Sequence, residues 1–319
     1  MKRLLKPLPK KPQRNKEEIM AQVTTAMVKQ LRERTSAGIL DCKNALVACD
    51  GDLDKAVDYL REKGIIKAGK KANRIAAEGI VMTEVKDASA VIVEVNSETD
   101  FVAKNEKFQN FVKDIIAQVF AGKASTVEEL LAEKSLTGDG TVNDDLVNMI
   151  ATIGEKLSVR RFEKIESDGI IISYVHGGGR IGVLVNAQAD DTPEVREALK
   201  NVALQIASMK PKYVDENDVD AAFLESEKAI LTTQAKNDPA NAKKPDNIIE
   251  KMILGRIKKE LKEICLLDQD YVKGDGNSVR DYLKSVGDIK ITGFIRYETG
   301  EGLEKKNENF AEEVAKQMQ

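Results

Sequence analysis

The stretch VNSETDFVAKNEKF, residues 95–108, places an acid and an aromatic residue where an apolar strand gives way to a helix. Asp100 carries a carboxylate that could serve as a general base, and Phe101 follows it at a position where a strand-to-helix loop should be exposed. An exposed phenylalanine gains free energy when another protein buries it. The pair therefore allows two kinds of chemistry, proton transfer by Asp100 or protein contact by Phe101.

The single histidine, His176, stands before a glycine run that formally matches a dinucleotide fingerprint, Gly177-x-Gly179-x-x-Gly182. That chemistry needs a strand before the glycines and a helix N-terminus after them. Here the β-branched segment RIGVLVN follows, so the glycines predict a hairpin turn and no direct nucleotide binding. By residue type alone His176 is a surface or turn residue, with contact to a partner as the functional alternative.

The other reactive side chains favour no enzyme. Cys42, Cys49 and Cys265 suit no disulfide framework and indicate reduced thiols in a cytosolic protein. One histidine leaves no histidine-rich metal site, and no spacing among the 53 acidic residues singles out a general-acid pair. We expect no metal, no cofactor and no covalent chemistry. An enzyme with Asp100 as its base stays open as an alternative.

The composition is that of a water-soluble chain with several small domains. It has 319 residues, of which 32% are charged, and a net charge of only −3, so nothing in the bulk charge asks for nucleic acid. No apolar run approaches the ~18 residues of a membrane span, and no signal peptide precedes the first helix. We expect a cytoplasmic protein that does not enter a membrane.

The elements that must position these residues begin with helices. Residues 1–19 are rich in Lys, Arg and Pro and predict a disordered or non-native leader. Residues 20–64 predict three short helices, the last capped by Asp52 and ended by Gly64. Residues 65–77 carry four basic residues before the first acid and predict a basic helical linker.

A repeat follows at an offset of 90 residues. EGIVMTEV and VIVEVN in residues 78–96 match DGIIISYV and IGVLVN in residues 168–186. Each copy predicts a β-hairpin followed by an amphipathic helix, and together they predict an α+β core with antiparallel sheets. The copies differ where the first has ETDFVAKNE and the second has QADDTPE.

The rest of the chain predicts a projecting helical hairpin and a closing segment. Two charged helical patterns in residues 215–265 flank the polar turn DPANAKKP, so they should pack antiparallel. Their apolar residues are too widely spaced for a core. After them come the strand-like IKITGFIRYETGEG and an amphipathic helix from Asn309.

Three stretches occur in the order typical of one family: LRERTSAGILDCKNAL, SETDFVAKNEKF and HGGGRIGVLV. From about Met20 onwards the chain resembles the elongation factor Ts family, guanine-nucleotide exchange factors of the GTPase elongation factor Tu. The resemblance implies a ubiquitin-associated-like (UBA-like) domain at 20–64, a core N-subdomain at 78–166, a core C-subdomain at 167–214 continued with a C-terminal module at 266–319, and a dimerisation-like hairpin at 215–265.

The resemblance also implies which residues meet the GTPase. The family's TDFV motif is Thr99, Asp100, Phe101 and Val102 here, and its Asp and Phe push between helices of the GTPase and disturb its magnesium site. Further contacts implied by the matching motifs are Arg32, Ile39, Leu40 and Lys43 for the first domain, Ile153, Gly154 and His176 for a second region, and, by a looser match, Met252 and Ile253.

A different class of function is a helical adaptor or nucleic-acid-binding protein without exchange activity, built on the three-helix domain and the basic linker. RNA binding that weakens with salt and needs no GTPase would favour it.

Overall fold

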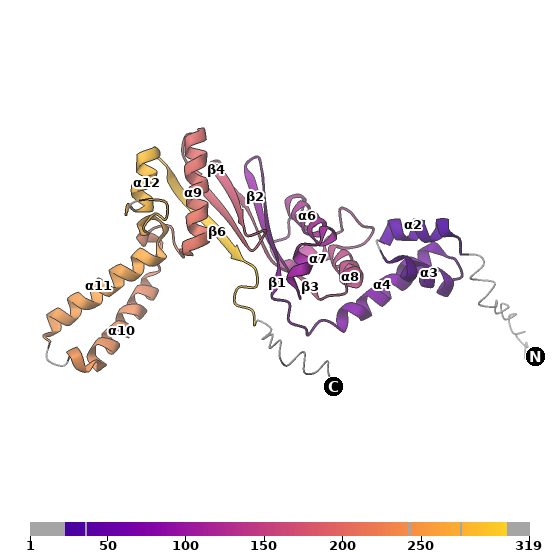
Figure 1. The fold of residues 1–319 in the computed structure, drawn as a ribbon, viewed down its shortest axis with the longest axis horizontal. Coiled ribbons are helices and arrows are strands. Elements are labelled where there is room, and N and C mark those ends of the chain that lie inside the picture. Colours follow the sequence, from indigo (N-terminus) through magenta and orange to yellow (C-terminus); the bar gives the residue numbers. More distant parts are fainter. Residues whose placement is uncertain (1–22, 36, 242–243, 275, 305–319) are drawn as a thin grey trace, which may run out of the picture.

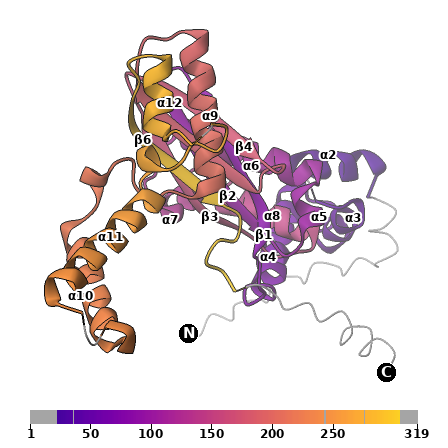
Figure 2. The same ribbon diagram turned by 60° about the vertical axis from the view of Figure 1, so that its left-hand side comes forward.

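The computed structural model describes residues 23–35, 37–241, 244–274 and 276–304, and it confirms the predicted α+β fold (Figure 1). Three N-terminal helices precede two three-stranded antiparallel sheets with their covering helices, and a helical hairpin projects from the second sheet's end of the molecule (Figures 1 and 2). The predicted leader and the predicted helix from Asn309 lie outside the described residues. The N-terminal helices are α2 (Thr25–Thr35), α3 (Ile39–Ala48) and α4 (Leu53–Gly69).

The three N-terminal helices enclose a small core of their own. Leu31, Cys42 and Leu46 have no exposed surface there. Cys42 is a free, buried thiol, and burial raises its pKa, so less of the reactive thiolate forms. Asp52 caps α4 as predicted, because its carboxylate accepts hydrogen bonds from the Asp54 and Lys55 backbone amides.

The prediction that Gly64 ends the third helix is wrong. Helix α4 continues through Gly64 to Gly69, so the first part of the basic linker belongs to it. A Cβ at Gly64 would lie 3.0 Å from Cγ1 of Val147 on helix α8 (Val142–Ile153). The glycine therefore permits close packing of two helices instead of terminating one.

The two sheets repeat one topology, with the middle strand paired antiparallel to both neighbours. The first has the order β1-β2-β3 and the second β4-β5-β6, so the repeat predicted at an offset of 90 supplies two strands of each. Strand β3 was not predicted from the sequence. The strands are β1 (Glu78–Lys86), β2 (Ser89–Ser97), β3 (Leu157–Glu166), β4 (Ile170–His176), β5 (Ile181–Gln188) and β6 (Lys290–Glu298).

Helices cover the outer face of each sheet, and a third apolar cluster lies between the sheets. Helices α6, α7 and α8 pack on the first sheet, and α9 and α12 pack on the second. The intervening cluster takes residues from both sheets, including Ile92 and Leu184. Because β2 is buried on both faces, residues 90–93 are apolar on both faces instead of alternating with polar residues. The helices are α5 (Asp100–Ala103), α6 (Glu106–Ala121), α7 (Val127–Ala132), α8 (Val142–Ile153), α9 (Pro193–Met209) and α12 (Val279–Val286).

A buried ionic cluster also joins the two sheets. Glu94 of β2 has no exposed surface and shares the inner face of its strand with Ile92. Its carboxylate accepts hydrogen bonds from Arg160 Nη1 at 2.9 Å, from Arg161 Nε at 2.6 Å and from the backbone N–H of Gly300 at 2.8 Å. The turn after β6 is thereby fixed to the first sheet.

The projecting hairpin consists of two antiparallel helices, as predicted (Figures 1 and 2). Its base returns to α9, because the buried Gln269 donates hydrogen bonds to the Met209 and Glu263 carbonyls. The hairpin helices are α10 (Ala221–Asn237) and α11 (Asp246–Ile264), with short 3-10 turns η1 (Glu216–Asp218), η2 (Pro239–Asn241) and η3 (Leu266–Asp268) around them.

Candidate functional site

The Asp100–Phe101 pair lies on α5, a one-turn helix between β2 and α6. The sequence predicted a loop here. The structure differs because the backbone leaves β2 at Thr99 in an extended conformation and then closes one helical turn. That turn ends before Asn105, whose side chain accepts the Lys107 N–H at 2.9 Å and starts α6. Asp100 and Phe101 therefore lie on a helical turn and not in an irregular loop.

The four TDFV residues have different environments. Phe101 is 79% exposed and is the most exposed of the large apolar side chains in the described residues. Val102 is 7% exposed and packs in the core of the first subdomain. Thr99 is tied to a neighbouring segment, because its N–H and its hydroxyl both donate to the Glu155 carboxylate. Asp100 and Phe101 are therefore the two that face outward.

The electrostatics of Asp100 do not suit a general base. Its carboxylate is 2.8 Å from the Lys104 ammonium one turn along the chain. That hydrogen bond lowers the pKa of Asp100 below its usual value. A carboxylate that is harder to protonate is a weaker base, so the geometry favours a role for Asp100 in ionic contact.

The structure brings Ile153 and Gly154 to the same place as Phe101. Ile153 ends α8, and Gly154 caps that helix with a left-handed φ of 86°. Phe101 and Ile153 line one shallow hollow together with the start of α6. Two segments that lie far apart in sequence therefore form one surface, whereas the family resemblance grouped Ile153 and Gly154 with His176.

The three-helix domain places its implied contact residues on an open face. Ile39 and Leu40 are 60% and 70% exposed at the start of α3, and Arg32 and Lys43 are exposed as well. Arg32 also lines a crevice that runs between α2, α6 and α8 and includes Thr152, which borders the Phe101 hollow. The domain therefore extends the Phe101 surface.

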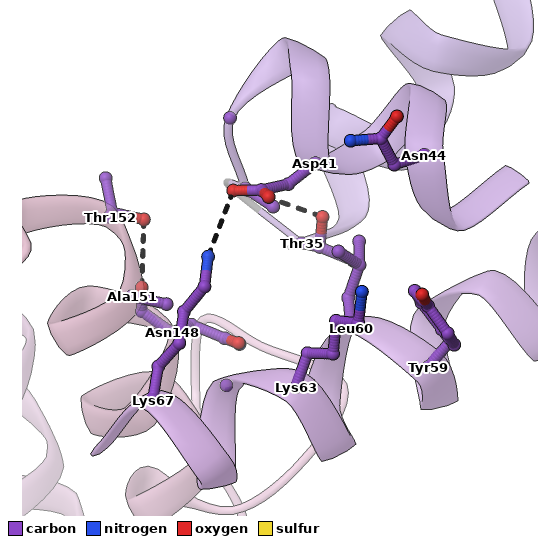
Figure 3. A pocket seen from close by; sticks show the side chains of 13 residues that line it. Thr35, Asp41, Asn44, Tyr59, Leu60, Lys63, Lys67, Asn148, Ala151 and Thr152 are labelled. Atoms are coloured by element: carbon purple, nitrogen blue, oxygen red, sulfur yellow. Dashed lines mark hydrogen bonds and ion pairs between the residues drawn. The ribbon is translucent and has the colours of Figure 1, made fainter. Parts of the chain in front are cut away.

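The position of the three-helix domain is set by α4 and α8. Arg61 of α4 donates two hydrogen bonds to the Asp144 carboxylate on α8, one of them from Nε at 2.7 Å. A small pocket lies beside this joint, and across it Lys67 points toward Asp41 at 3.4 Å (Figure 3). Helix α8 thus holds the domain along its length and carries Ile153 at its end.

His176 lies at the β4–β5 turn, where the glycines form the predicted hairpin. The ring is exposed, and its Nδ1 is 2.9 Å from the Tyr174 hydroxyl. A Cβ at Gly179 would lie 2.1 Å from Ile80 Cγ1, and one at Gly182 would lie 2.4 Å from Val81 Cγ1. The glycine spacing therefore allows the second sheet to approach β1, which explains the motif without a nucleotide.

The structure separates Met252 and Ile253 from the other implied contacts. Both lie on α11 in the projecting hairpin, away from α5 and α2 (Figure 1). Ile253 is 4% exposed, and Met252 is half-buried and accepts a contact from Lys244 Nζ at its sulfur. Because Val102 and Ile253 are buried, neither presents its side chain to a partner in this conformation.

Sequence reasoning missed the acids that support the site. Glu98 and Glu155 connect the start of α5 to the segment after α8. A carboxylate next to Gly154 was the only signal, and it does not reveal a partner 56 residues away. Among the described residues, no group of three or more His, Cys, Asp or Glu could hold a metal ion. No helix in the described ranges is long and apolar enough to cross a membrane.

Two comparisons with known proteins bear on the family of this chain. The family model described as Elongation factor TS matches residues 98–301, which include α5, strand β3 of the first sheet, the whole second sheet and the hairpin. The elongation factor Ts of Clostridioides difficile (strain 630) is 50% identical over 307 residues, which cover 94% of this chain and 100% of that protein. The chain belongs to the elongation factor Ts family.

Proposed function

We propose that this protein is a guanine-nucleotide exchange factor that binds elongation factor Tu·GDP and promotes release of GDP. Membership of the elongation factor Ts family makes it a translation elongation factor rather than a catalytic enzyme. The observation that carries the specific proposal is Phe101, an apolar side chain that is 79% exposed on a helix fixed at both ends.

The exchange step is an insertion of Phe101 between helices of the GTPase. Full burial of such a side chain is worth about 2 kcal/mol, which is available only after contact. A GTPase holds its nucleotide largely through Mg²⁺ and the phosphate-binding backbone. A conformation that accepts Phe101 and disturbs that site binds GDP more weakly, so the factor acts without touching the nucleotide. Asp100 enters with Phe101 as a fixed negative charge.

The remaining contacts align the two proteins before insertion. Arg32, Ile39, Leu40 and Lys43 dock the three-helix domain on the GTPase, and their exposure supports this role. Ile153 borders the hollow beside Phe101, and Gly154 follows it as the cap of α8, so both extend the contact of Phe101. His176 projects from the β4–β5 turn and meets a second region of the partner. No bond is made or broken by this chain, and no cofactor is needed.

A GDP-release assay with elongation factor Tu tests the proposal. The protein should accelerate loss of a fluorescent GDP analogue and leave the final GDP/GTP ratio on the free GTPase unchanged. Binding of the factor and of GDP should be antagonistic by the same factor in both directions, because linkage is reciprocal. Equal affinities for the nucleotide-free and GDP-bound GTPase in calorimetry would show docking without exchange.

We also infer that the α10–α11 hairpin mediates association of two copies of this chain. It projects from the body, and it exposes Ile230 and Leu254 by 45% and 51%. Replacement of residues 226–258 by a short Gly/Ser linker should lower the mass seen in sedimentation while much of the exchange activity stays. An unchanged oligomer after this deletion would contradict the inference.

A further inference from the structure

We propose that Glu98 and Glu155 are positioning residues that hold α5 in the orientation from which Phe101 inserts. The proposal rests on the exchange function proposed above, and it assigns a role to two side chains that lie behind the contact surface. Glu98 and Glu155 hold α5 through a pair of reciprocal contacts, which we call the glutamate clasp.

The clasp joins the start of α5 to the segment that follows α8. Glu155 accepts the backbone N–H of Thr99 at 3.0 Å and the Thr99 hydroxyl at 2.7 Å. In return, Glu98 accepts the backbone N–H of Lys156 at 2.6 Å. Each acid therefore binds the backbone next to the other, so the two segments cannot slide past one another without breaking both contacts.

Helix α5 needs this external support because it is only four residues long. Such a turn is not stable by itself, since helix nucleation fixes several residues for one hydrogen bond. Its N-cap residue, Thr99, makes no side-chain capping bond to the helix, and its hydroxyl goes to Glu155 instead. Val102 anchors the opposite side of the turn in the core. The clasp and Val102 together leave Phe101 little freedom to swing.

Basic residues of the linker after α4 close the clasp from outside. Arg74 Nη1 lies 3.2 Å from a Glu98 carboxylate oxygen, and Lys156 Nζ donates to the Arg74 carbonyl at 2.9 Å. Lys71 Nζ donates to the Gly154 carbonyl at 2.7 Å. The basic residues of this linker thus contact both ends of the clasp. The positively charged groups of Lys71 and Arg74 therefore make their contacts within the chain.

The clasp explains why a helix so short can act as a wedge. A side chain that is already oriented loses less conformational freedom on insertion than one that is mobile. Removal of the clasp should therefore slow GDP release in the complex more than it weakens docking, because the docking residues of the three-helix domain lie elsewhere. We expect Glu155→Ala to lower the rate of GDP release at saturating factor by about 10-fold, with less than about twofold change in affinity for the GTPase.

Glu133 provides a matched control in the same subdomain. Its carboxylate also accepts two backbone N–H groups, those of Lys123 and Ala124, at 3.2 Å each. It holds the connection between α6 and α7, where it accepts hydrogen bonds from Gln118, Lys123 and Ala124. Glu133→Ala should lower the melting temperature about as much as Glu155→Ala does, and it should leave exchange unchanged.

Orientation can be measured without the partner, because the chain contains no tryptophan. Phe101→Trp introduces a single indole at the wedge, and its fluorescence anisotropy reports local motion. Glu155→Ala in this background should lower the anisotropy, Glu155→Gln should restore part of it, and Glu133→Ala should not change it. Unchanged anisotropy in the folded Glu155→Ala variant overturns the proposal. If that variant does not fold, Thr99→Val removes the hydroxyl contact and takes its place.

A double-mutant cycle separates positioning from general stability. Once Phe101→Ala has removed the wedge, Glu155→Ala should cause no further loss of GDP release, whereas two independent losses would multiply. Multiplied losses contradict the positioning role. If the unaltered protein fails to accelerate GDP release at all, the proposed function fails instead, and the anisotropy result still decides whether the clasp orients position 101.

Discussion

The two copies of the repeat connect strand to helix in different ways. In the second copy β5 ends at Gln188, and residues 189–192 lead directly into α9, where Thr192 accepts the Val195 N–H and Pro193 opens the helix. In the first copy residues 98–105 separate β2 from α6 and include the extra helix α5. The second connection only starts a helix, while the first also displays Phe101.

The difference shows where a duplicated fold can acquire a function. The strands and the covering helix carry the core in both copies, so their apolar pattern is constrained. The connection at the end of the central strand lies at the surface and can lengthen without loss of core packing. A segment added there still needs support, and in this chain neighbouring carboxylates supply it.

The largest effect should come from giving the first copy the connection of the second. Replacement of residues 98–105 by the sequence ADDT of residues 189–192 removes Asp100, Phe101 and the clasp together. We expect GDP release to fall on the order of 100-fold, since about 3 kcal/mol of contact is lost. Circular dichroism should still show a folded protein. Exchange at the parental rate would mean that the two connections are functionally equivalent.

A single substitution should slow nucleotide exchange without affecting the stability of the fold. Phe101→Ala should slow GDP release roughly 30-fold, the equivalent of about 2 kcal/mol, and leave the melting temperature unchanged because the side chain is exposed. Phe108→Ala, in the helix that follows, should do the reverse. Phe108 is fully buried, so its loss should destabilise the fold by about 3–5 kcal/mol. Thermal melts of both variants beside the release assay decide the matter.

Loss of the Asp100 charge should slow GDP release less than loss of Phe101 does, and by the same factor over a wide pH range. Lys104 lowers the pKa of Asp100, so the carboxylate stays ionised from about pH 8 down to about pH 5. Any stability from this pair is present above the unfolded pKa and is lost as the pH falls through the lower, folded pKa. Asp100→Asn should slow release about threefold at every pH in that range. A defect that disappears toward pH 5 would refute a role for the charge.

The smallest effect is expected in the second connection. Asp191 contacts Arg196 at 2.5 and 2.6 Å in an exposed pair at the start of α9. Asp191→Ala should leave exchange unchanged and hardly alter the free energy of unfolding, because exposed ion pairs contribute little. Denaturant titration together with the release assay would reveal any larger role.

Local pattern was enough to predict much of the fold. Helices α6 and α9, the two β-hairpins and the projecting hairpin follow from apolar periodicity and from turn residues. Strand β3 was missed because its Arg160 and Arg161 look solvent-exposed in sequence, whereas in the fold they bind the buried Glu94. Gly64 was misread because the nearby helix that requires it comes later in the chain.

The candidate site was predicted in its parts and not in its assembly. An exposed apolar residue at Phe101 was visible in the sequence, since the second copy has nothing like it. The contact between Glu155 and Thr99 was not visible, because it spans 56 residues and no periodicity records it. Which residues of a short helix face outward also depends on that contact. Long-range polar pairing is therefore the part that a single sequence conceals.

The hydrogen bond between the Gly300 N–H and the Glu94 carboxylate has a consequence for folding during synthesis on the ribosome. The two groups are 206 residues apart, so the acid emerges roughly 10–40 s before the amide that satisfies it, at ordinary rates of synthesis. During that interval β6 is also missing, and the inner face of the first sheet lacks part of its cover. Until then the nascent chain exposes the Glu94 carboxylate and part of the apolar face of the first sheet. Native assembly of the two halves is thus one of the last events of its synthesis.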